Sequence, residues 1–324
     1  MSLQNFSYHD TIGIASFLGR GFMNPIDLRF DSTGRLFVLS RSNASNKNVR
    51  VSAQTLDSEF LYEFANWGTD PGQTTMPTAL AFDSRDRLYV SDEHMHNVSI
   101  FDREGNFVER WGEFGSEPGQ FNRPSGLAVD SDDNVLVMDH LNSRIQKMTP
   151  DGRYISSFGS AGDEPGEFNF AWGISVDSGG DIWVADWRND RIQRFTADGE
   201  FVSMFGSSGT ADGKFDRPSG VHVDDRGQVY VADWRNDRVQ VFDNDGGHTE
   251  TLVGDATLSK WCQEFIDVNP EQAGWRENAG LFEEEKRFWR PSAIETNSDG
   301  LVLIVDACRH RVQIYSKINE PALA

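Results

Sequence analysis

The chain has 324 residues, an apolar fraction of 38% and a formal net charge of −21 at pH 7. This charge disfavours nucleic acid as a partner, because Lys and Arg supply most of the non-specific affinity for phosphates. No apolar run is long enough to cross a membrane, and MSLQNFSYHD at the start lacks the features of a secretory signal, so we expect a cytoplasmic protein. Cys262 and Cys308 are too few for a disulfide framework, although a single bridge between them remains open.

A repeat of about 47 residues organises the sequence. The word VADWRNDR occurs at residues 184–191 and again at 231–238, and the residues around it match as well. Six units can be aligned on the residues that open their first apolar stretch, which are Pro25, Pro77, Pro124, Ala171, Pro218 and Pro291. These positions are 52, 47, 47, 47 and 73 residues apart, so two units carry insertions.

Each unit has the pattern of a small antiparallel sheet. In the third unit, short apolar stretches alternate with turn clusters such as SDDN and TPDG at spacings that predict four strands. Six such sheets arranged radially would bury both faces of each, whereas a solenoid would be expected to show polar capping units. Residues 12–19, IGIASFLG, resemble the fourth-strand pattern YISSFG at 154–159, and the last unit ends before its own fourth strand. We therefore expect a single all-β domain, residues 1–324, forming a six-bladed β-propeller whose N-terminal strand completes the last blade.

The repeated frame FNRPSGLAVD, then V-x-D-x-x-N-x-R-I-Q and PDG, resembles the NHL repeat. The resemblance is strongest in the units that start at Phe121, Phe168 and Phe215, and weakest in the first, where Ser40 replaces a recurrent aspartate. It implies a propeller and a wide range of activities, from RNA-binding and protein-binding scaffolds to sensor domains and amidating lyases. Those lyases have zinc histidines directly after the strand-opening proline. The equivalent positions in this chain contain no histidine; they are Ile26, Thr78, Ser125, Trp172, Ser219 and Ser292.

Charged residues mark the first strand of three units, the strand expected nearest the axis. The position that holds Ala81, Ala128 and Ser175 in units two to four holds other residues in units one, five and six, namely Arg29, His222 and Glu295. Asp27 faces the same side as Arg29, because side chains alternate along a strand. One interpretation is an ion pair between Arg29 and Glu295 that closes the ring.

The other interpretation of these residues is a reaction centre. His222 would exchange a proton, Glu295 would act as a base and Arg29 would stabilise developing negative charge. Asp27, His222 and Glu295 could instead hold one divalent cation in the channel. A second, weaker metal hypothesis joins His94 and His96 to His140, with surface histidines as the alternative.

The repeated sequence VADWRNDR covers the end of the second strand and the loop after it in the fourth and fifth units. We expect Asp186 to bind Arg191, and Asp233 to bind Arg238, as structural ties within these loops. Trp187 and Trp234 are not demanded by the repeat, since the same position holds Glu93, His140 and Ala307 elsewhere. With Trp172 they could form an aromatic wall at the channel mouth. Loop packing is the alternative, and the ligand-binding candidates are Trp172, Trp187, Arg188, Trp234, Arg235, His140 and Trp261.

The connection between the fifth and sixth units, residues 255–288, predicts helices. Apolar residues recur at helical spacing, at Leu258, Trp261, Cys262, Phe265 and Ile266, and Asn269-Pro270-Glu271 has the pattern of a second helix start. We expect this insert to lie over the channel beside Cys308 as a lid. It could also recruit a partner, or simply pack on the rim.

Two functions follow from these features. The first is binding of a small polar or anionic ligand at the channel mouth under the insert, with lyase or hydrolase chemistry only by analogy, since no catalytic motif is found. The second is a non-catalytic scaffold for a protein partner, which an open mouth and an exposed apolar insert would favour. RNA binding through Arg123, Arg217 and Arg290 is opposed by the acidic total charge.

Overall fold

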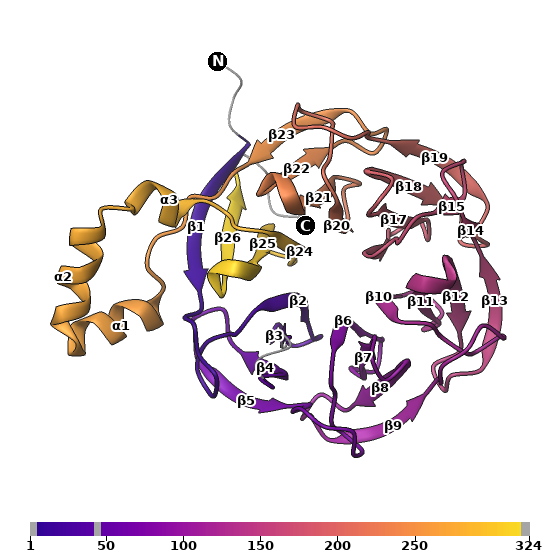
Figure 1. Cartoon of the computed structure of the whole chain (residues 1–324), viewed down its shortest axis with the longest axis horizontal. Helices are drawn as coiled ribbons and strands as arrows, with labels where there is room; N and C mark the ends of the chain where they lie inside the picture. Colours follow the sequence, from indigo (N-terminus) through magenta and orange to yellow (C-terminus); the bar gives the residue numbers. More distant parts are fainter. Residues whose placement is uncertain (1–4, 42–46, 319–324) are drawn as a thin grey trace.

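A ring of six four-stranded antiparallel sheets forms the protein (Figure 1). The computed structural model describes residues 5–41 and 47–318. Blades one and two consist of β2 (Pro25–Phe30), β3 (Leu36–Ser40), β4 (Arg50–Gln54) and β5 (Phe60–Phe64), then β6 (Pro77–Phe82), β7 (Leu88–Asp92), β8 (Asn97–Phe101) and β9 (Phe107–Trp111). Blade three consists of β10 (Pro124–Val129), β11 (Val135–Asp139), β12 (Arg144–Met148) and β13 (Tyr154–Phe158).

The remaining blades follow in chain order. Blade four consists of β16 (Ile174–Val176), β17 (Ile182–Asp186), β18 (Arg191–Phe195) and β19 (Phe201–Phe205), with β14 (Ser160–Ala161) and β15 (Glu167–Phe168) pairing before it. Blade five consists of β20 (Pro218–Val223), β21 (Val229–Asp233), β22 (Arg238–Phe242) and β23 (His248–Leu252). Blade six consists of β24 (Pro291–Thr296), β25 (Leu301–Asp306), β26 (Arg311–Lys317) and β1 (Phe6–Ile12). Short 3₁₀ turns follow three second strands, η1 (His140–Asn142), η2 (Trp234–Asn236) and η3 (Ala307–Arg309).

The inner strand of each blade lines the central channel and runs in one direction along it. Five inner strands begin at the predicted proline, and we call the end of the channel where these strands begin the top face. The core lies between neighbouring sheets: Leu39 and Val51 of blade one pack with Leu80 and Val90 of blade two. Burial of each such side chain contributes on the order of 2 kcal/mol, so the ring depends on contacts between repeats.

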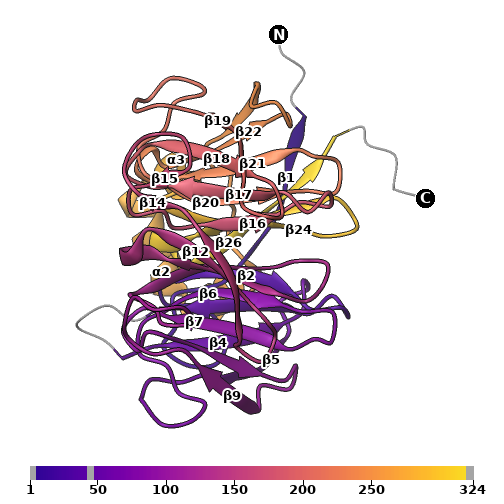
Figure 2. The ribbon, with the colours of Figure 1, turned by 90° about the vertical axis from the view of Figure 1, so that its right-hand side faces the viewer.

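The N-terminal strand closes the ring, as predicted. β1 pairs with β26 from Phe6 opposite Lys317 to Ile12 opposite Val312. The two described ends also meet, since the backbone N–H of Ile318 donates to the carbonyl of Asn5 (2.7 Å). The indigo β1 and the yellow β26 lie side by side (Figure 2).

The predicted position of that strand, residues 12–19, is wrong by six residues. Phe17 and Leu18 lie in a loop and are 55% and 74% exposed. Gly13 directly follows Ile12, the last residue of β1. A Cβ atom on Gly13 would lie 2.8 Å from the ring of Phe22. The same contact, with the same spacing of nine residues, joins Gly159 to Phe168. Aligning Gly13 rather than Gly19 with Gly159 gives the observed register.

The repeated aspartates tie each loop to its blade, as predicted. In blade three, Asp139 accepts a hydrogen bond from Arg144 Nε (2.8 Å), and Arg144 Nη2 donates to the carbonyls of Glu117 and Gln120. This network fixes the loop that arrives from the preceding blade. Equivalent pairs occur in blades four, five and six, namely Asp186–Arg191, Asp233–Arg238 and Asp306–Arg311.

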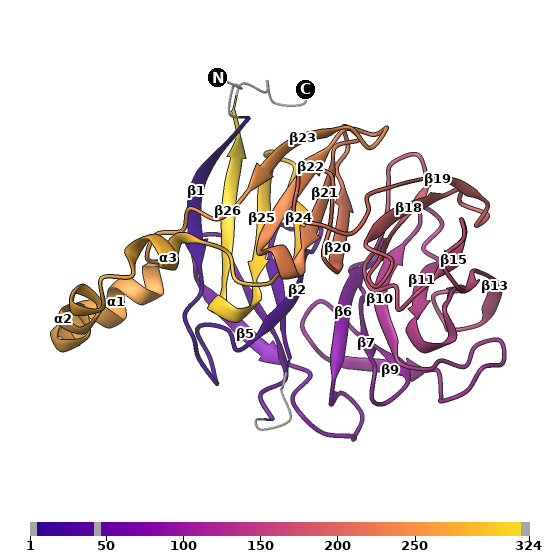
Figure 3. The same cartoon turned by 45° about the horizontal axis from the view of Figure 1, so that its top comes forward.

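The insert contains three helices, α1 (Lys260–Val268), α2 (Pro270–Ala279) and α3 (Phe282–Lys286). Two helices are present where the sequence predicted them. The predicted start of α2 is confirmed, with Pro270 in its first turn, although the Asn269 side chain makes no capping hydrogen bond. Ser259 caps α1, and α3 was not predicted. The helices project outward beside blades six and one (Figures 1 and 3). The predicted position over the channel is therefore wrong.

The reason for this placement is the side chain of Trp261. It is 3% exposed, packs with residues of blades six and one, and contacts the ring of Phe22 edge-on. Its Nε1–H donates to the carbonyl of Ser58 in blade one (2.7 Å). Trp261 is therefore part of the core at the ring's edge, not a ligand contact at the channel mouth. Cys262 and Cys308 are free thiols, so the bridge left open by the sequence does not form.

Candidate functional site

A cavity of about 220 Å³ lies at the end of the channel opposite the top face. We call it the lower cavity. The predicted charged half of the channel is present there, since one side is lined by Arg29, His222 and Glu295. The opposite side is small or apolar, with Ala81, Ala128, Ser175, Phe82, Leu127, Val129, Ile174 and Val176. The inner-strand alternation therefore placed these residues correctly in one cavity.

The charges in the lower cavity are paired with each other. Arg29 Nη1 lies 2.8 Å from Asp27 Oδ1, and Arg29 Nε lies 3.5 Å from Glu295 Oε2. Asp27 also accepts hydrogen bonds from the backbone N–H groups of Leu28 (2.9 Å) and Leu80 (2.7 Å). Asp27 thus joins the inner strands of blades one and two, and Arg29 joins blade one to blade six. The predicted ring-closing ion pair is observed.

Two groups in the lower cavity titrate abnormally. Burial raises the pKa of Glu295 to about 7, because the loss of water outweighs the attraction of Arg29. Burial and then the charge of Arg29 lower the pKa of His222 to about 3, so its imidazole is neutral at pH 7. His222 Nε2 lies 2.8 Å from the hydroxyl of Thr296. A neutral imidazole and a half-ionised carboxyl group are chemically able to accept or donate a proton here.

The upper part of the channel is nearly closed. Its volume is about 30 Å³, enough for one or two water molecules. Inner strands approach closely, since a Cβ at Gly126 would lie 2.4 Å from the carbonyl oxygen of Trp172. Hydroxyl groups also bridge neighbouring inner strands: Thr78 donates to Pro124 O, and Ser292 donates to Ile26 O.

This narrow section separates the two halves of the predicted site. Trp172 lines the top of the channel, at the position of Ile26, and Arg29 lies three residues further along an inner strand, about 10 Å at strand spacing. Trp187 and Trp234 do not line the lower cavity. The prediction of one pocket between the tryptophans and the charged residues is therefore wrong.

The tryptophans form a group of their own on the top face. The rings of Trp187 and Trp234 lie 6.3 Å apart between two guanidinium groups, that of Arg217 at 4.3 Å from Trp187 and that of Arg290 at 4.5 Å from Trp234. We define the top-face cluster as these four residues together with Phe170, Trp172, His140 and Arg188.

The second part of the top-face cluster surrounds the channel mouth. His140 is buried between Phe170 (5.1 Å) and Trp172 (5.2 Å), and its Nδ1 lies 2.9 Å from the carbonyl oxygen of Ala171. Burial lowers the pKa of His140, so the ring is neutral. The guanidinium of Arg188 lies 4.0 Å from the ring of Phe170. The aromatic wall expected at the channel mouth thus includes Phe170, which the sequence analysis missed.

The sequence analysis considered the arginines before the strand-opening prolines only for RNA binding and missed their contact with the tryptophans. Arg217 and Arg290 have φ values of 59° and 57°, a left-handed backbone that is unusual for residues other than glycine. Each lies beside the tryptophan of its neighbouring loop. The recurring Arg-Pro pair next to a Trp-Arg-Asn loop was the available signal. Arg235, by contrast, lies 3.8 Å from Asp216 in an exposed pair.

Neither metal hypothesis is supported by the arrangement of the described residues. No group of three or more His, Cys, Asp or Glu side chains is placed to hold an ion within residues 5–41 and 47–318. His94 is exposed, while His96 Nδ1 accepts a hydrogen bond from the backbone N–H of Arg123 (3.1 Å). Asp27 lines the upper channel rather than the lower cavity, and its oxygens are occupied by Arg29 and two backbone N–H groups.

Family comparisons agree with the repeat and the ring. The NHL repeat matches residues 168–195, 215–242 and 288–315, and a family described as a 6-bladed beta-propeller matches residues 78–147. Two of these matches fall on units in which the sequence resemblance is strongest, those that start at Phe168 and Phe215, and the third falls on blade six. A comparison with curated proteins finds no match. None of the helices in the described part of the chain has the length and apolar character needed to cross a membrane.

Solved structures of similar fold have little sequence in common with this chain. A protein of unknown function from Bacteroides thetaiotaomicron has 18% identity and a TM-score of 0.64, over 98% of this chain and 76% of that one. A streptogramin B lyase has 13% identity and a TM-score of 0.60, over 97% and 98%. An inactive virginiamycin B lyase from Staphylococcus aureus with quinupristin has 13% identity and a TM-score of 0.60, over 97% and 100%. These likenesses concern the fold alone. The chain is a six-bladed β-propeller that carries NHL repeats.

Proposed function

We propose that this propeller is a non-catalytic scaffold that binds an acidic segment of another protein on its top face. The observation that carries the proposal is the pair of tilted rings of Trp187 and Trp234, each in contact with one guanidinium group, those of Arg217 and Arg290. A guanidinium stacked on an aromatic ring keeps its in-plane N–H donors free for carboxylates. Tryptophan and arginine are also the residues most often found as energetic centres of protein interfaces.

The charges of the top-face cluster support an acidic partner. Arg188, Arg217 and Arg290 form no ion pair within the described residues, although the chain has a net charge of −21. An uncompensated cation on such a surface is a local site for a carboxylate. The position of the insert leaves this face uncovered (Figure 1), and the channel below it is nearly closed, so a ligand of this face would bind on its surface rather than inside the ring.

A peptide-display selection tests this proposal. We expect the wild-type protein to enrich peptides that contain Asp or Glu beside an aromatic residue. The double variant Trp187→Ala, Trp234→Ala should bind the selected peptides at least about tenfold more weakly, because it loses both stacking surfaces and the order of the arginines. Fluorescence anisotropy measures the dissociation constants.

The matched control is Arg153→Gln, which removes an exposed arginine paired with Asp151 away from the top-face cluster. This variant should bind as the wild type does. Equal binding by the double variant, at an unchanged melting temperature, would refute the proposal, as would a selection that enriches no acidic peptides.

A second candidate function is binding of a small polar ligand in the lower cavity, with proton transfer as its chemistry. The observation that favours it is the neutral His222 beside Glu295, whose pKa lies near 7, in a cavity of about 220 Å³. Lyase or hydrolase activity would follow only by analogy with propellers of this fold.

A further inference from the structure

A second pocket, with a volume of about 640 Å³, lies between the insert and blade six. We call it the insert pocket. Its volume falls within the range of about 300–1,000 Å³ that is typical of small-molecule sites. The walls come from the end of β1 and the loop after it, from the three helices of the insert, and from η3 and β26. The insert therefore covers a pocket, although not the central channel.

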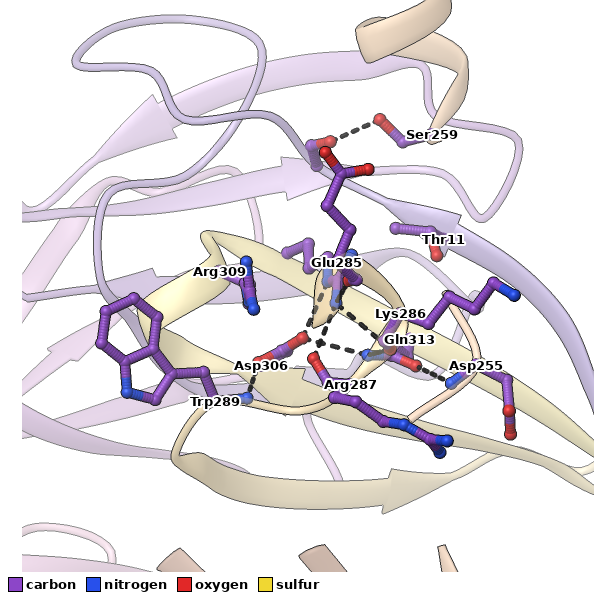
Figure 4. A network of polar contacts seen from close by, with 12 residues as sticks. Thr11, Asp255, Ser259, Glu285, Lys286, Arg287, Trp289, Asp306, Arg309 and Gln313 are labelled. Carbon is purple, nitrogen blue, oxygen red and sulfur yellow. Dashed lines mark hydrogen bonds and ion pairs between the residues drawn. The ribbon is translucent and has the colours of Figure 1, made fainter. Parts of the chain in front are cut away.

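Both ends of the insert are attached to blade six by the loop-binding residues of the repeat (Figure 4). At its start, the backbone N–H of Asp255 donates to Gln313 Oε1 (3.1 Å). At its end, Arg311 Nη2 donates to the carbonyls of Glu285 (2.6 Å) and Arg287 (3.1 Å). Asp306 holds both Arg311 Nε (2.7 Å) and Gln313 Nε2 (3.0 Å).

The same attachment in blade three holds only a short loop. There the N–H of Gly119 donates to Gln146 Oε1 (2.9 Å), and Arg144 Nη2 donates to the carbonyl of Gln120 (3.1 Å). In blade three these two attachment points are consecutive residues, so the helices of the insert are extra chain placed between them. The walls of the insert pocket near blade six are as firmly held as an ordinary blade connection.

Positive charge borders the insert pocket. Its lining residues include Arg276, Lys286, Arg309 and Arg311, against a single carboxylate, that of Glu285. Arg276 pairs with Glu285 (2.7 Å) and Arg311 pairs with Asp306 (2.7 Å). These two arginines are therefore neutralised within the protein.

Arg309 is different. It forms no ion pair among residues 5–41 and 47–318, and its buried Nε has no hydrogen-bond partner there. Its Nη2 donates to the carbonyl of Glu284 (2.7 Å), which fixes the guanidinium at the edge of the pocket. The guanidinium therefore carries a positive charge that no carboxylate of the described residues neutralises, and a ligand carboxylate at the edge of the pocket would pair with it.

Apolar side chains form another part of the wall. Ile14, Leu258 and Phe282 line the pocket, and the ring of Phe282 lies 4.8 Å from the guanidinium of Arg276. A ligand that matches both surfaces carries one anionic group and an apolar body. Inorganic phosphate would satisfy the charge but leave the apolar wall uncovered.

We propose that the insert pocket binds a small carboxylic acid, with its carboxylate at Arg309 and its hydrocarbon part against Ile14, Leu258 and Phe282. This site is separate from the top-face cluster and adds a small-molecule ligand to the proposed scaffold. Its occupancy would link the insert more firmly to the blade at which the ring closes.

Isothermal titration with three probes tests the chemistry of the site. We expect hexanoate to bind, and hexanamide and inorganic phosphate to bind at least about tenfold more weakly, because each lacks one of the two matched features. Arg309→Gln should weaken hexanoate binding by a similar factor. Arg153→Gln, the same substitution at an exposed arginine far from the pocket, should leave it unchanged.

The two free thiols provide a second readout that needs no variant. Cys262 lines the insert pocket and Cys308 does not. Hexanoate should slow alkylation of Cys262 by iodoacetamide and leave Cys308 unaffected, as measured by mass spectrometry of the peptides. The proposal is refuted if hexanoate gives neither heat nor protection at about 10 mM, where a millimolar site is largely filled, or if hexanamide and Arg309→Gln bind as well.

Discussion

Residues that depart from the repeat are compensated by neighbours within their blade. In blade one, Ser40 stands where other blades have an aspartate, and Arg50 pairs instead with Glu63 on the fourth strand (3.2 Å). In blade two, Asn97 stands where others have the arginine, and Arg110 on the fourth strand donates to the carbonyl of Gln73 (2.7 Å). Glu63 and Arg110 occupy equivalent positions on the fourth strands. This position carries a negative charge in blade one, which lacks the aspartate, and a positive charge in blade two, which lacks the arginine.

The raised pKa of Glu295 predicts a pH dependence of stability. A carboxyl group that is harder to ionise in the folded state stabilises the fold below its unfolded pKa of about 4.5, and this contribution is lost as pH rises through about 7. Between pH 5 and pH 8 the wild type should lose up to about 3 kcal/mol relative to Glu295→Gln. Urea unfolding of both proteins at the two pH values measures the difference. If the difference in unfolding free energy between the two proteins does not change with pH, the assigned pKa of Glu295 is wrong. Titration of His222 occurs in both proteins and so does not contribute to this difference.

At the scale of elements, α1 contacts both blade six and blade one and connects them. Trp261 fills the joint between these blades, and Lys260 Nζ donates to the carbonyl of Asp57 in blade one (3.2 Å). Arg20, in the loop after β1, pairs with Glu264 (2.9 Å). The helix thus contacts both sides of the seam that the N-terminal strand closes, while α2 remains largely exposed.

Trp261→Ala should therefore lower the free energy of unfolding by about 3–5 kcal/mol, the usual cost of truncating a buried aromatic side chain. The matched control is Trp275→Ala on α2, where the indole is 64% exposed and the expected change is within about 0.5 kcal/mol. Chemical denaturation of the two variants measures both values. Equal effects of the two substitutions would show that α1 does not hold the seam.

For the whole molecule, the ring is closed by hydrogen bonds rather than by a covalent connection. Among the described strands, β1 alone covers the outer edge of β26, and its Phe6 and Ile12 side chains are fully buried. An uncovered edge of this kind exposes unpaired backbone groups and an apolar surface. The stability of all six blades is therefore coupled to a strand at one end of the chain.

Removal of residues 1–12 should lower the melting temperature markedly, and a synthetic peptide of residues 5–13 should restore it by adding the missing strand in trans. Thermal unfolding with and without peptide measures the effect. A peptide in which Phe6 and Ile12 are replaced by Asp serves as the control and should not restore the midpoint. An unchanged melting temperature in the truncated chain would mean that ring closure adds no stability.

Repetition made the fold predictable. Five prolines, the Asp and Arg in the loops of blades three to six, and the alternation along the inner strands recur with the period of a blade. Strand positions and the lining of the lower cavity could therefore be predicted, as for Arg29 and Glu295. The pairing of Arg29 with Glu295 was one of two interpretations that the sequence left open, and the structure shows the pair.

Features that occur once were decided by tertiary packing. The register of β1 depends on the contact of Gly13 with Phe22, and the place of the insert depends on the fit of Trp261 between two blades distant in sequence. The separation of Trp187 from His222 depends on how closely the inner strands approach one another in the upper channel. Such distances across the ring are not encoded in the period of any one repeat, because they are set by side-chain volumes contributed from several blades at once.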